Sequence, residues 1–324
     1  MLKPKIAIIG AGLSGLSCAK KLCLAGFSPT VIEKSRGIGG RLSTRRIGNQ
    51  FSFDHGAQYV SSNGYDFNLY LNEAMEKGVA GEWCRMHSNA NAKPKSKPKI
   101  VGLKGMSNLV TPLAENLDLH FNSAVKSINP HNNGWEVETI NKLGKTTFDI
   151  VVITIPAPQA RELLSTQLVI SSDLNKVQFS PCLAAMIAFE DKISIETNTF
   201  MSPNSELAWC ARNSSKPNQQ LLPDCWIVHA SAGWSEKNID SSKDEIAKNL
   251  LKIFSNTFHI KLPKVQFLAG HKWRYAFACL PLKKDYILSS EKTLIVGGDW
   301  CLGNRAEDAY DTGLSIASFI SNTF

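Results

Sequence analysis

The stretch IAIIGAGLSG, residues 6–15, decides the fold of the N-terminal part of the chain. Its first four residues, Ile6–Ile9, form a short apolar run that is typical of a buried parallel strand. A helix is expected over about residues 14–24, ended by Gly26, and a second strand at Thr30–Ile32. Strand, tight turn, helix and strand in this order predict a βαβ unit.

The glycines of the turn have the spacing of a dinucleotide-binding fingerprint. Gly10 permits the turn, Gly12 lets the backbone approach a pyrophosphate, and Gly15 lets the helix pack on the strand. The helix N-terminus then offers N–H groups and partial positive charge to phosphate. Glu33 ends the second strand, where it can accept hydrogen bonds from ribose hydroxyls and repel a 2′-phosphate. The sequence therefore predicts a site for a dinucleotide.

A second Gly-rich turn favours FAD over NAD as that dinucleotide. The turn, Gly37–Arg41, follows Glu33 closely. An NAD enzyme has no particular need of this turn, whereas FAD is a longer, extended molecule that requires more binding contacts along its length. Gly39 and Gly40 permit close approach of the backbone, and the Arg41 guanidinium matches pyrophosphate oxygens.

Two later segments suit the flavin end of FAD. Phe53–Tyr59 reads FDHGAQY, and its small residues Gly56 and Ala57 would let a flat ring lie against the backbone. Gly297–Trp300 reads GGDW and precedes the last predicted helix. Asp299 can accept from ribitol hydroxyls, and the helix N-terminus behind it can face the flavin edge on which negative charge develops.

The bulk composition is that of an ordinary globular enzyme, with 324 residues of which 43% are hydrophobic and 20% charged. No apolar run reaches the ~18 residues of a membrane span. Lys3 and Lys5 before an apolar stretch imitate a secretory signal, but that stretch is better used as the first strand. The eight cysteines are scattered and form no CxxC pair, which disfavours a metal site and fits a reducing compartment. We therefore expect a cytoplasmic protein with no metal and no membrane partner.

The net charge of +8 and the pI of about 9.0 raise the question of nucleic acid. Most of the charge is dispersed, and the one dense cluster is interleaved with prolines: Lys93, Lys95, Lys97 and Lys99. Alternate prolines block a helix, so an extended and solvated loop is expected. Such a loop is either a plain surface or attracts a small anionic substrate, and no nucleic-acid partner is predicted.

The rest of the chain alternates between two sequence patterns, of which the first is that of the N-terminal βαβ unit. A helix at 107–116 and strands at 125–128, 135–138 and 149–154 continue this first pattern. From about 163 to 288, alternating strands and a helix at about 242–257 indicate an α+β domain with an antiparallel sheet. A strand at 293–296 and a helix from about residue 304 return to the first pattern.

These two sequence patterns predict an α/β Rossmann-type FAD-binding domain that is discontinuous, and an α+β substrate domain with a mixed or antiparallel sheet. The FAD-binding domain is assigned residues 1–60, 99–162 and 289–324, and the substrate domain residues 61–98 and 163–288.

The ordered motifs resemble the flavin amine oxidase superfamily and, within it, the bacterial renalase family. The flavin motifs are shared by many relatives of this superfamily. The narrower resemblance rests on segments beyond them: Gly105–Ser107, Asn213–Pro217, Trp226–Ser231 with Trp234-Ser235, and Trp273–Ala276. The likeness extends over essentially the whole chain.

This resemblance implies an activity. Renalases oxidise 2- and 6-dihydro isomers of NAD(P)H, passing hydride to flavin N5 and then electrons to oxygen, which yields hydrogen peroxide. It further implies non-covalent FAD, although Cys301 follows the flavin-binding turn. The partners expected are a small anionic dinucleotide and molecular oxygen.

Motifs and resemblance together assign the site residues. The predicted cofactor contacts are Gly10, Ala11, Gly12, Leu13, Ser14, Gly15, Glu33, Lys34, Gly40, Arg41, Val125, Gly298, Asp299 and Ala306. The predicted substrate contacts are His55, Gly56, Ala57, Gln58, Tyr59, His229 and Leu302. No catalytic triad is predicted, because the flavin carries the chemistry. His229 lies in an apolar strand and is either a core histidine or a hydrogen-bond partner of the substrate.

Two alternatives stay open. One is a flavin amine oxidase or polyene desaturase relative, although no aromatic pair of the amine oxidase kind is evident. The other is a flavin-binding redox sensor or scaffold without turnover. Asp308 and Thr312 stand in the last helix where the renalase resemblance leads us to expect Gly and Ser, and they put the substrate fit in question.

Overall fold

The structure is a computed structural model that describes residues 3–83, 97–140, 143–164, 170–202 and 205–324. Its first layer is a six-stranded sheet in the order β17-β18-β11-β1-β2-β7. Every pairing is parallel except that of β17 at one edge. The strands are β1 (Ile6–Ile9), β2 (Thr30–Ile32), β7 (Asp118–His120), β11 (Ile150–Ile153), β17 (Ile287–Leu288) and β18 (Leu294–Val296). The predicted βαβ unit and the return of the C-terminal segment to this sheet are thus confirmed.

The two faces of this sheet are covered differently. Helices α1 (Leu13–Leu24) and α9 (Ala306–Thr323) lie side by side on one face and bury Ile6 and Ile8. The other face buries Ala7 and Ile9 against an antiparallel sheet formed by β8 (Val125–His131), β9 (Gly134–Thr139) and β10 (Lys145–Phe148). Because both faces are covered, the strands are apolar without alternation.

Helix α1 packs so closely on β1 that their backbones are in contact at Gly15 and Gly10. A Cβ on Gly15 would lie 2.0 Å from the Gly10 carbonyl oxygen and 2.7 Å from Thr154 Oγ1. Gly10 itself has φ +107°, which L side chains rarely adopt. A similar approach joins the two helices, since a Cβ on Gly313 would lie 2.0 Å from Ser17 Oγ. Glycine is therefore required where the helix meets the strand.

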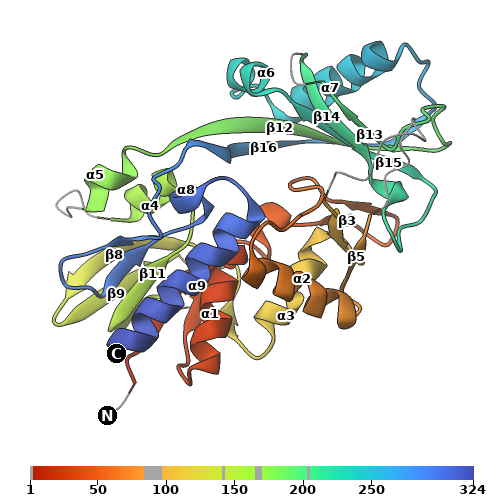
Figure 1. Ribbon diagram of the computed structural model, residues 1–324. Helices are drawn as coiled ribbons and strands as arrows, with labels where there is room; N and C mark the ends of the chain where they lie inside the picture. Colours follow the sequence, from red (N-terminus) through yellow and green to blue (C-terminus); the bar gives the residue numbers. More distant parts are fainter. Residues whose placement is uncertain (1–2, 84–96, 141–142, 165–169, 203–204) are drawn as a thin grey trace.

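A second, five-stranded antiparallel sheet has the order β13-β14-β15-β12-β16. One face packs against α7 (Lys243–Phe258), whose capping box pairs Ser242 with Glu245. The other face meets Phe53 from the N-terminal half. Figure 1 shows the long strands β12 and β16 reaching from this sheet towards α8 and α4. The strands are β12 (Gln178–Phe189), β13 (Thr199–Met201), β14 (Leu207–Arg212), β15 (Asp224–Ala230) and β16 (Val265–Leu280).

The smaller elements connect these layers. The helices are η1 (Gly40–Leu42), α2 (Tyr65–Glu76), η2 (Met106–Val110), α3 (Thr111–Ala114), α4 (Ala157–Leu163), α5 (Ile170–Leu174), η3 (Asn213–Ser215), α6 (Ala232–Lys237) and α8 (Asp299–Leu302). Two short antiparallel pairs are β3 (Arg45–Ile47) with β4 (Phe51–Phe53), and β5 (Ala80–Glu82) with β6 (Ile100–Gly102).

Two sequence-based predictions are corrected. The helix expected at 107–116 is a 3₁₀ turn, η2, followed by the four-residue α3, because Pro112 supplies no N–H to continue the turn. Lys99 is not solvated: it is 8% exposed, and its ammonium lies 4.1 Å from the Tyr59 ring centre. Lys93 and Lys95 of the same predicted loop lie outside the described residues.

The domain boundaries stay a prediction. Helix α2, assigned to the substrate domain, contributes Phe67 and Leu71 to the same core cluster as α1 and α9. We propose that residues 65–76 are better grouped with the FAD-binding domain.

The Gly15 contact yields a stability test. Gly15→Ala should lower the free energy of unfolding by about 1–3 kcal/mol, because the contacted Gly10 oxygen belongs to backbone and cannot move freely. Gly12→Ala is the matched control, since a Cβ there meets nothing within 4 Å. Urea unfolding of the FAD-free proteins measures both, and equal loss in the two variants would contradict the packing argument.

Candidate cofactor and substrate site

The carboxylate of Glu33 ties the first two predicted cofactor loops together. Its oxygens accept hydrogen bonds from the backbone N–H of Ala11 at 2.9 Å and of Ser35 at 2.7 Å. The residue is 8% exposed, and its own carbonyl accepts from the Ser123 N–H at 2.9 Å. That last bond holds the segment before β8 beside Glu33, and β8 begins at the predicted cofactor contact Val125. Glu33 is thus a structural support of the loop as well as a predicted ribose ligand.

The N-terminus of α1 has the features of a phosphate site. No side chain of the described residues caps it, and its first turn holds no acidic residue. The Ser14 hydroxyl is buried and has no hydrogen-bond partner within the described part of the chain. A Cβ on Gly12 would project into open space. Free N–H groups, an unused hydroxyl and space at a helix N-terminus fit the pyrophosphate of FAD.

The second Gly-rich turn lies directly against the first. The Gly39 N–H donates to the Ala11 carbonyl at 2.9 Å, and a Cβ on Gly40 would approach the Gly12 Cα at 3.4 Å. Gly39 and Gly40 have φ of +110° and +53°, so glycine serves the turn itself. The two turns predicted from separate motifs therefore form one surface.

Arg41 and Asp299 form an ion pair that the sequence did not reveal. Arg41 Nη2 donates to Asp299 Oδ1 at 2.5 Å, and Nη1 donates to the Ala276 carbonyl at 2.9 Å. These contacts use two of the five guanidinium donors within the described residues, and Arg41 as a phosphate ligand stays a prediction. The pair joins the N-terminal turn to α8, far away in the sequence. The motifs alone predict separate roles, Arg41 on the pyrophosphate and Asp299 on the ribitol.

The last helices hold the remaining predicted cofactor residues. Gly298 precedes α8, and Ala306 begins α9 and packs against the core under α1. The Cys301 thiol is fully buried, and burial raises its pKa to about 12. A protonated thiol is a poor nucleophile, which supports the prediction of non-covalent FAD. Lys34 is exposed beside Glu33.

The two departures from the renalase pattern have structural uses. The Asp308 carboxylate accepts from the Arg305 N–H at 2.7 Å and so caps α9. The Thr312 hydroxyl donates to the Gly298 carbonyl at 3.1 Å. Both side chains are thereby held next to the α8 turn.

A cluster of four rings surrounds the start of the predicted substrate segment. We define the ring cluster as His55, His229, His271 and Trp273. His229 Nε2 and Trp273 Nε1 donate to the His55 carbonyl at 3.1 and 2.9 Å. The ring centres of His55 and His271 are 4.6 Å apart, and those of His271 and Trp273 4.4 Å. A carbonyl only accepts, so Nε2 of His229 carries a proton.

The three imidazoles of this cluster are neutral at ordinary pH. Burial lowers the pKa of His55 and His229 to about 4 and that of His271 to about 3. Nearby cations add to the effect: Arg45 acts on His55 and His271, Lys216 on His229, and Lys243 on His271. The cluster therefore offers neutral polar rings beside the cations Arg45 and Lys243 and the ion pair of Lys216 with Asp54, whose carboxylate acts on His55 in the opposite direction.

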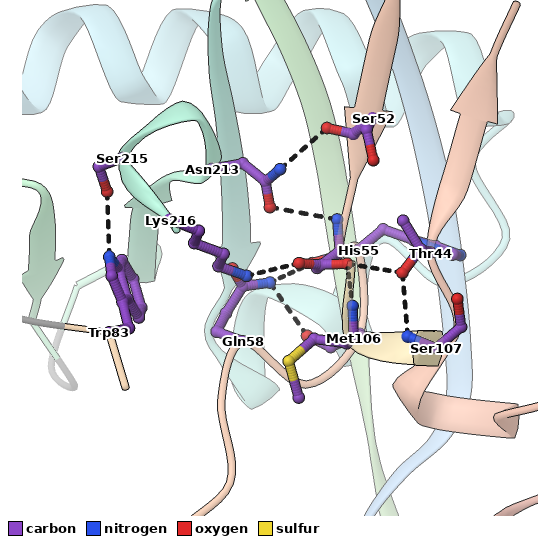
Figure 2. A network of polar contacts seen from close by, with 12 residues as sticks. Thr44, Ser52, His55, Gln58, Trp83, Met106, Ser107, Asn213, Ser215 and Lys216 are labelled. Carbon is purple, nitrogen blue, oxygen red and sulfur yellow. Dashed lines mark hydrogen bonds and ion pairs between the residues drawn. The ribbon is translucent and has the colours of Figure 1, made fainter. Parts of the chain in front are cut away.

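A buried ion pair beside the ring cluster was missed by sequence reasoning. Lys216 Nζ donates to Asp54 Oδ2 at 2.8 Å, and both side chains are 1% exposed. Asp54 Oδ1 accepts from the Thr44 hydroxyl and the Met106 N–H, each at 2.7 Å. Figure 2 shows Lys216 directed at this point, between Gln58 and Asn213. The only signal in the sequence was that both residues lie inside quoted motifs, FDHGAQY and NSSKP.

Of the predicted substrate contacts, the structure brings His55–Tyr59 and His229 together. Gln58 Nε2 donates to the Asp54 and Gly56 carbonyls, and Tyr59 lies under the Lys99 ammonium. Leu302 ends α8, and its place as a substrate contact stays a prediction. His271 and Trp273, both on β16, join the site although neither was assigned to it.

Comparison with known proteins identifies the family. The family model for flavin containing amine oxidoreductases matches residues 78–320, and that for an NAD(P)-binding Rossmann-like domain matches residues 8–73. The chain therefore belongs to the flavin containing amine oxidoreductases, and its cofactor is FAD. No helix among the described residues is both long and apolar enough for a membrane span.

Individual relatives differ in how much of the chain they match. Renalase of Mus musculus is 22% identical over 348 residues, covering 96% of this chain and 97% of that protein. The 4,4'-diapophytoene desaturase of Staphylococcus aureus (strain Newman) is 39% identical over 56 residues, only 17% of this chain and 11% of its own. Protein anon-37Cs of Drosophila melanogaster is 40% identical over 67 residues, 20% of this chain and 13% of its own.

Solved structures confirm the fold over the whole chain. A protein from Exiguobacterium sp. 255-15, provisionally assigned as a protoporphyrinogen oxidase, has a TM-score of 0.78 at 12% identity, with 100% of both chains covered. Putrescine oxidase bound to putrescine has a TM-score of 0.73 at 14% identity, with 98% of both chains covered. At these identities the likeness establishes the fold alone.

Glu33 gives a test of the cofactor loops. Glu33→Gln should weaken FAD binding by ~1.5–3 kcal/mol for each charged hydrogen bond lost to ribose. It should also destabilise the FAD-free protein, because the amide group cannot accept from both the Ala11 and Ser35 N–H groups. Equilibrium dialysis and thermal unfolding measure the two effects. Glu82→Gln, on an exposed strand end, is the control, and unchanged FAD affinity in Glu33→Gln would show that the ribose is held elsewhere.

The neutral imidazoles predict a pH dependence of stability. Their folded pKa values lie below the unfolded value of about 6.5, so the unfolded chain binds more protons as the pH falls. The contribution of these imidazoles to the free energy of unfolding should be constant above about pH 7. It should fall towards about pH 4 by about 2–3 kcal/mol for each imidazole. Chemical unfolding of the FAD-loaded protein across this range measures it.

Two variants separate this effect from general acid sensitivity. His271→Gln should reduce the loss, because it removes one buried imidazole, whereas His131→Gln on the exposed β8–β9 turn should not. Equal slopes in both variants would contradict the assignment.

Proposed function

We propose that the protein is a renalase-type oxidase that converts 2- and 6-dihydro isomers of NAD(P)H to NAD(P)⁺ and produces hydrogen peroxide. The observation that carries this proposal is the end-to-end likeness to mouse renalase, which includes the substrate sheet. The desaturase and anon-37Cs matches are limited to short stretches and give no comparable support.

The electrostatics of the ring cluster support an anionic, hydride-donating substrate. Four charged side chains act on its imidazoles: Arg45, Asp54, Lys216 and Lys243. Lys216 and Asp54 form an ion pair and offset each other, which leaves the cations Arg45 and Lys243 in excess. A protonated amine would meet repulsion here, whereas the phosphates of a dinucleotide would be attracted.

The residues of the cluster suit positioning more than acid–base chemistry. A dihydronicotinamide gives up hydride without first losing a proton, so the reaction needs no charged base. Bound FAD supplies the hydride acceptor and the reactivity towards oxygen. The chain orients the nicotinamide: Ala57 presents a small side chain on the turn, and His229 offers a polar ring. Gly56 leaves no such room, because a Cβ there would lie 2.1 Å from the Arg41 carbonyl oxygen and 3.1 Å from Trp273. All dihydro isomers share one dinucleotide handle, so only ring position can distinguish them.

Anaerobic stopped-flow spectroscopy tests the proposal. The 2- and 6-dihydro isomers should bleach the oxidised flavin band near ~450 nm much faster than ordinary 4-dihydro NADH or a panel of amines. Admission of air should then yield hydrogen peroxide. Faster bleaching by an amine would establish the amine oxidase alternative. Bleaching by none of them would favour the sensor or scaffold alternative.

His229→Ala adds a residue-level arm to this experiment. It should slow reduction by the favoured isomer more than it lowers FAD content, because the imidazole is bonded to the His55 carbonyl and not to the predicted cofactor loops. His131→Ala, an exposed histidine, is the control and should react as the unmodified protein does.

A further inference from the structure

The turn formed by residues 54–58 is fixed on one side by the FAD-binding half of the chain. The Ala57 N–H donates to the Arg41 carbonyl at 2.9 Å, and a Cβ on Gly56 would lie 2.1 Å from the same oxygen. Thr44 and Met106 donate to the Asp54 carboxylate. This side of the turn therefore rests on backbone and has no freedom to shift towards Arg41.

The other side of the same turn is held by the substrate sheet and its η3 loop. Lys216 donates to Asp54 Oδ2 at 2.8 Å and to Gln58 Oε1 at 3.3 Å. Asn213 accepts from the Asp54 N–H at 3.3 Å and donates to the Ser52 carbonyl at 2.9 Å. Figure 2 shows Lys216 and Asn213 on one side, Thr44 on the other and Met106 below them. Lys216 alone among these side chains bonds to both ends of the turn.

The Lys216 ammonium is buried, although removing a charged group from water is unfavourable. Lys216 is 3% exposed, and burial lowers the pKa of its amine. An ion pair removed from water is a weak source of stability, because desolvation offsets its attraction. Its geometry, in contrast, is specific: one ammonium bridges a carboxylate and an amide oxygen four residues apart, and lies 5.3 Å from the Trp83 ring centre.

We propose that Lys216 is a positioning residue, which fixes the 54–58 turn between the two sheets and thereby sets the place of His55 and Gly56 at the substrate site. The part that concerns substrate rests on the proposed function. Lys216 acts through Asp54 and Gln58 and needs no contact with the substrate itself. The His55 carbonyl, which holds His229 and Trp273, moves with the turn.

The competing explanation is that the pair only balances charge. Lys216→Met alone leaves Asp54 buried without its counter-ion and is expected to destabilise the protein. The double variant Asp54→Asn/Lys216→Met removes both charges, keeps an oxygen for Thr44 and Met106, and serves if the single variant does not fold. It restores charge balance without restoring the bond to Gln58. Lys272→Met is the matched control, because that ammonium bonds to the Ile239 carbonyl, away from the turn.

Amide hydrogen exchange of the FAD-loaded proteins, read by mass spectrometry, tests the positioning without any substrate. Exchange in the peptide spanning residues 54–58 should rise about ten-fold in the double variant. Exchange in β1 should stay unchanged, and Lys272→Met should match the unmodified protein in both. Unchanged exchange at 54–58 in the double variant would overturn the proposal.

Stopped-flow reduction by the 2- or 6-dihydro isomer tests the consequence for the site. The limiting rate at saturating substrate should fall about ten- to a hundred-fold in the double variant, with FAD content unchanged, since small misplacements cost rate more than binding. A limiting rate equal to that of the unmodified protein would reduce the pair to charge balance and overturn the proposal. If the unmodified protein reacts with no dihydro isomer, the proposed function fails, while the exchange measurement still decides the role of Lys216.

Discussion

The Asp54 side chain is almost completely buried, and an ionised group in that position must find donors within the protein. It finds them on three segments that are distant in sequence: Thr44 after the second Gly-rich turn, Met106 at the start of η2, and Lys216 after η3. Satisfying one charge therefore brings the cofactor-side loops and the substrate sheet to a common point. The ring cluster depends on this arrangement, because its central acceptor, the His55 carbonyl, belongs to the residue next to Asp54.

Two other carboxylates close the discontinuous FAD-binding half in the same manner. Glu33 joins the loops after β1 and β2 by accepting from backbone N–H groups, and Asp299 joins α8 to Arg41. Charge-assisted bonds of this kind are short and directional, so they fix the position of a loop more closely than apolar packing does. The proposed cofactor site thus consists of loops oriented by carboxylates and of a helix N-terminus that no side chain of the described residues caps.

The sequence predicted the features that depend on local geometry. The fingerprint around Gly10 and Gly15 located the βαβ unit, because close packing of helix on strand excludes every other residue there. It could not predict that Arg41 pairs with Asp299, or that Lys99 is buried with its ammonium over the Tyr59 ring. Both are contacts between segments far apart in the chain, and composition assigned Lys99 to solvent because its neighbours are lysines and prolines. For the same reason His271 and Trp273 were not assigned to the site. Trp273 lies in a segment quoted for the family resemblance, but it is the register of β16 against β12 that brings both residues to His55.

The charge pattern around the ring cluster links this architecture to the proposed substrate. Burial keeps three imidazoles neutral, and the cations Arg45, Lys216 and Lys243 reinforce that state. Proton abstraction from a cationic amine would require a strong base and a negative counter-charge. Imidazoles whose pKa is lowered to about 3–4 are weak bases, and they carry no negative charge. Hydride donation by a neutral dihydronicotinamide requires only that one ring carbon be held at the right distance and angle. The proposed site, a turn held by both sheets, lined by neutral rings and flanked by the cations Arg45 and Lys243, meets that requirement. The constraint that buries Asp54 is therefore also the one that suits the site to the proposed anionic hydride donor.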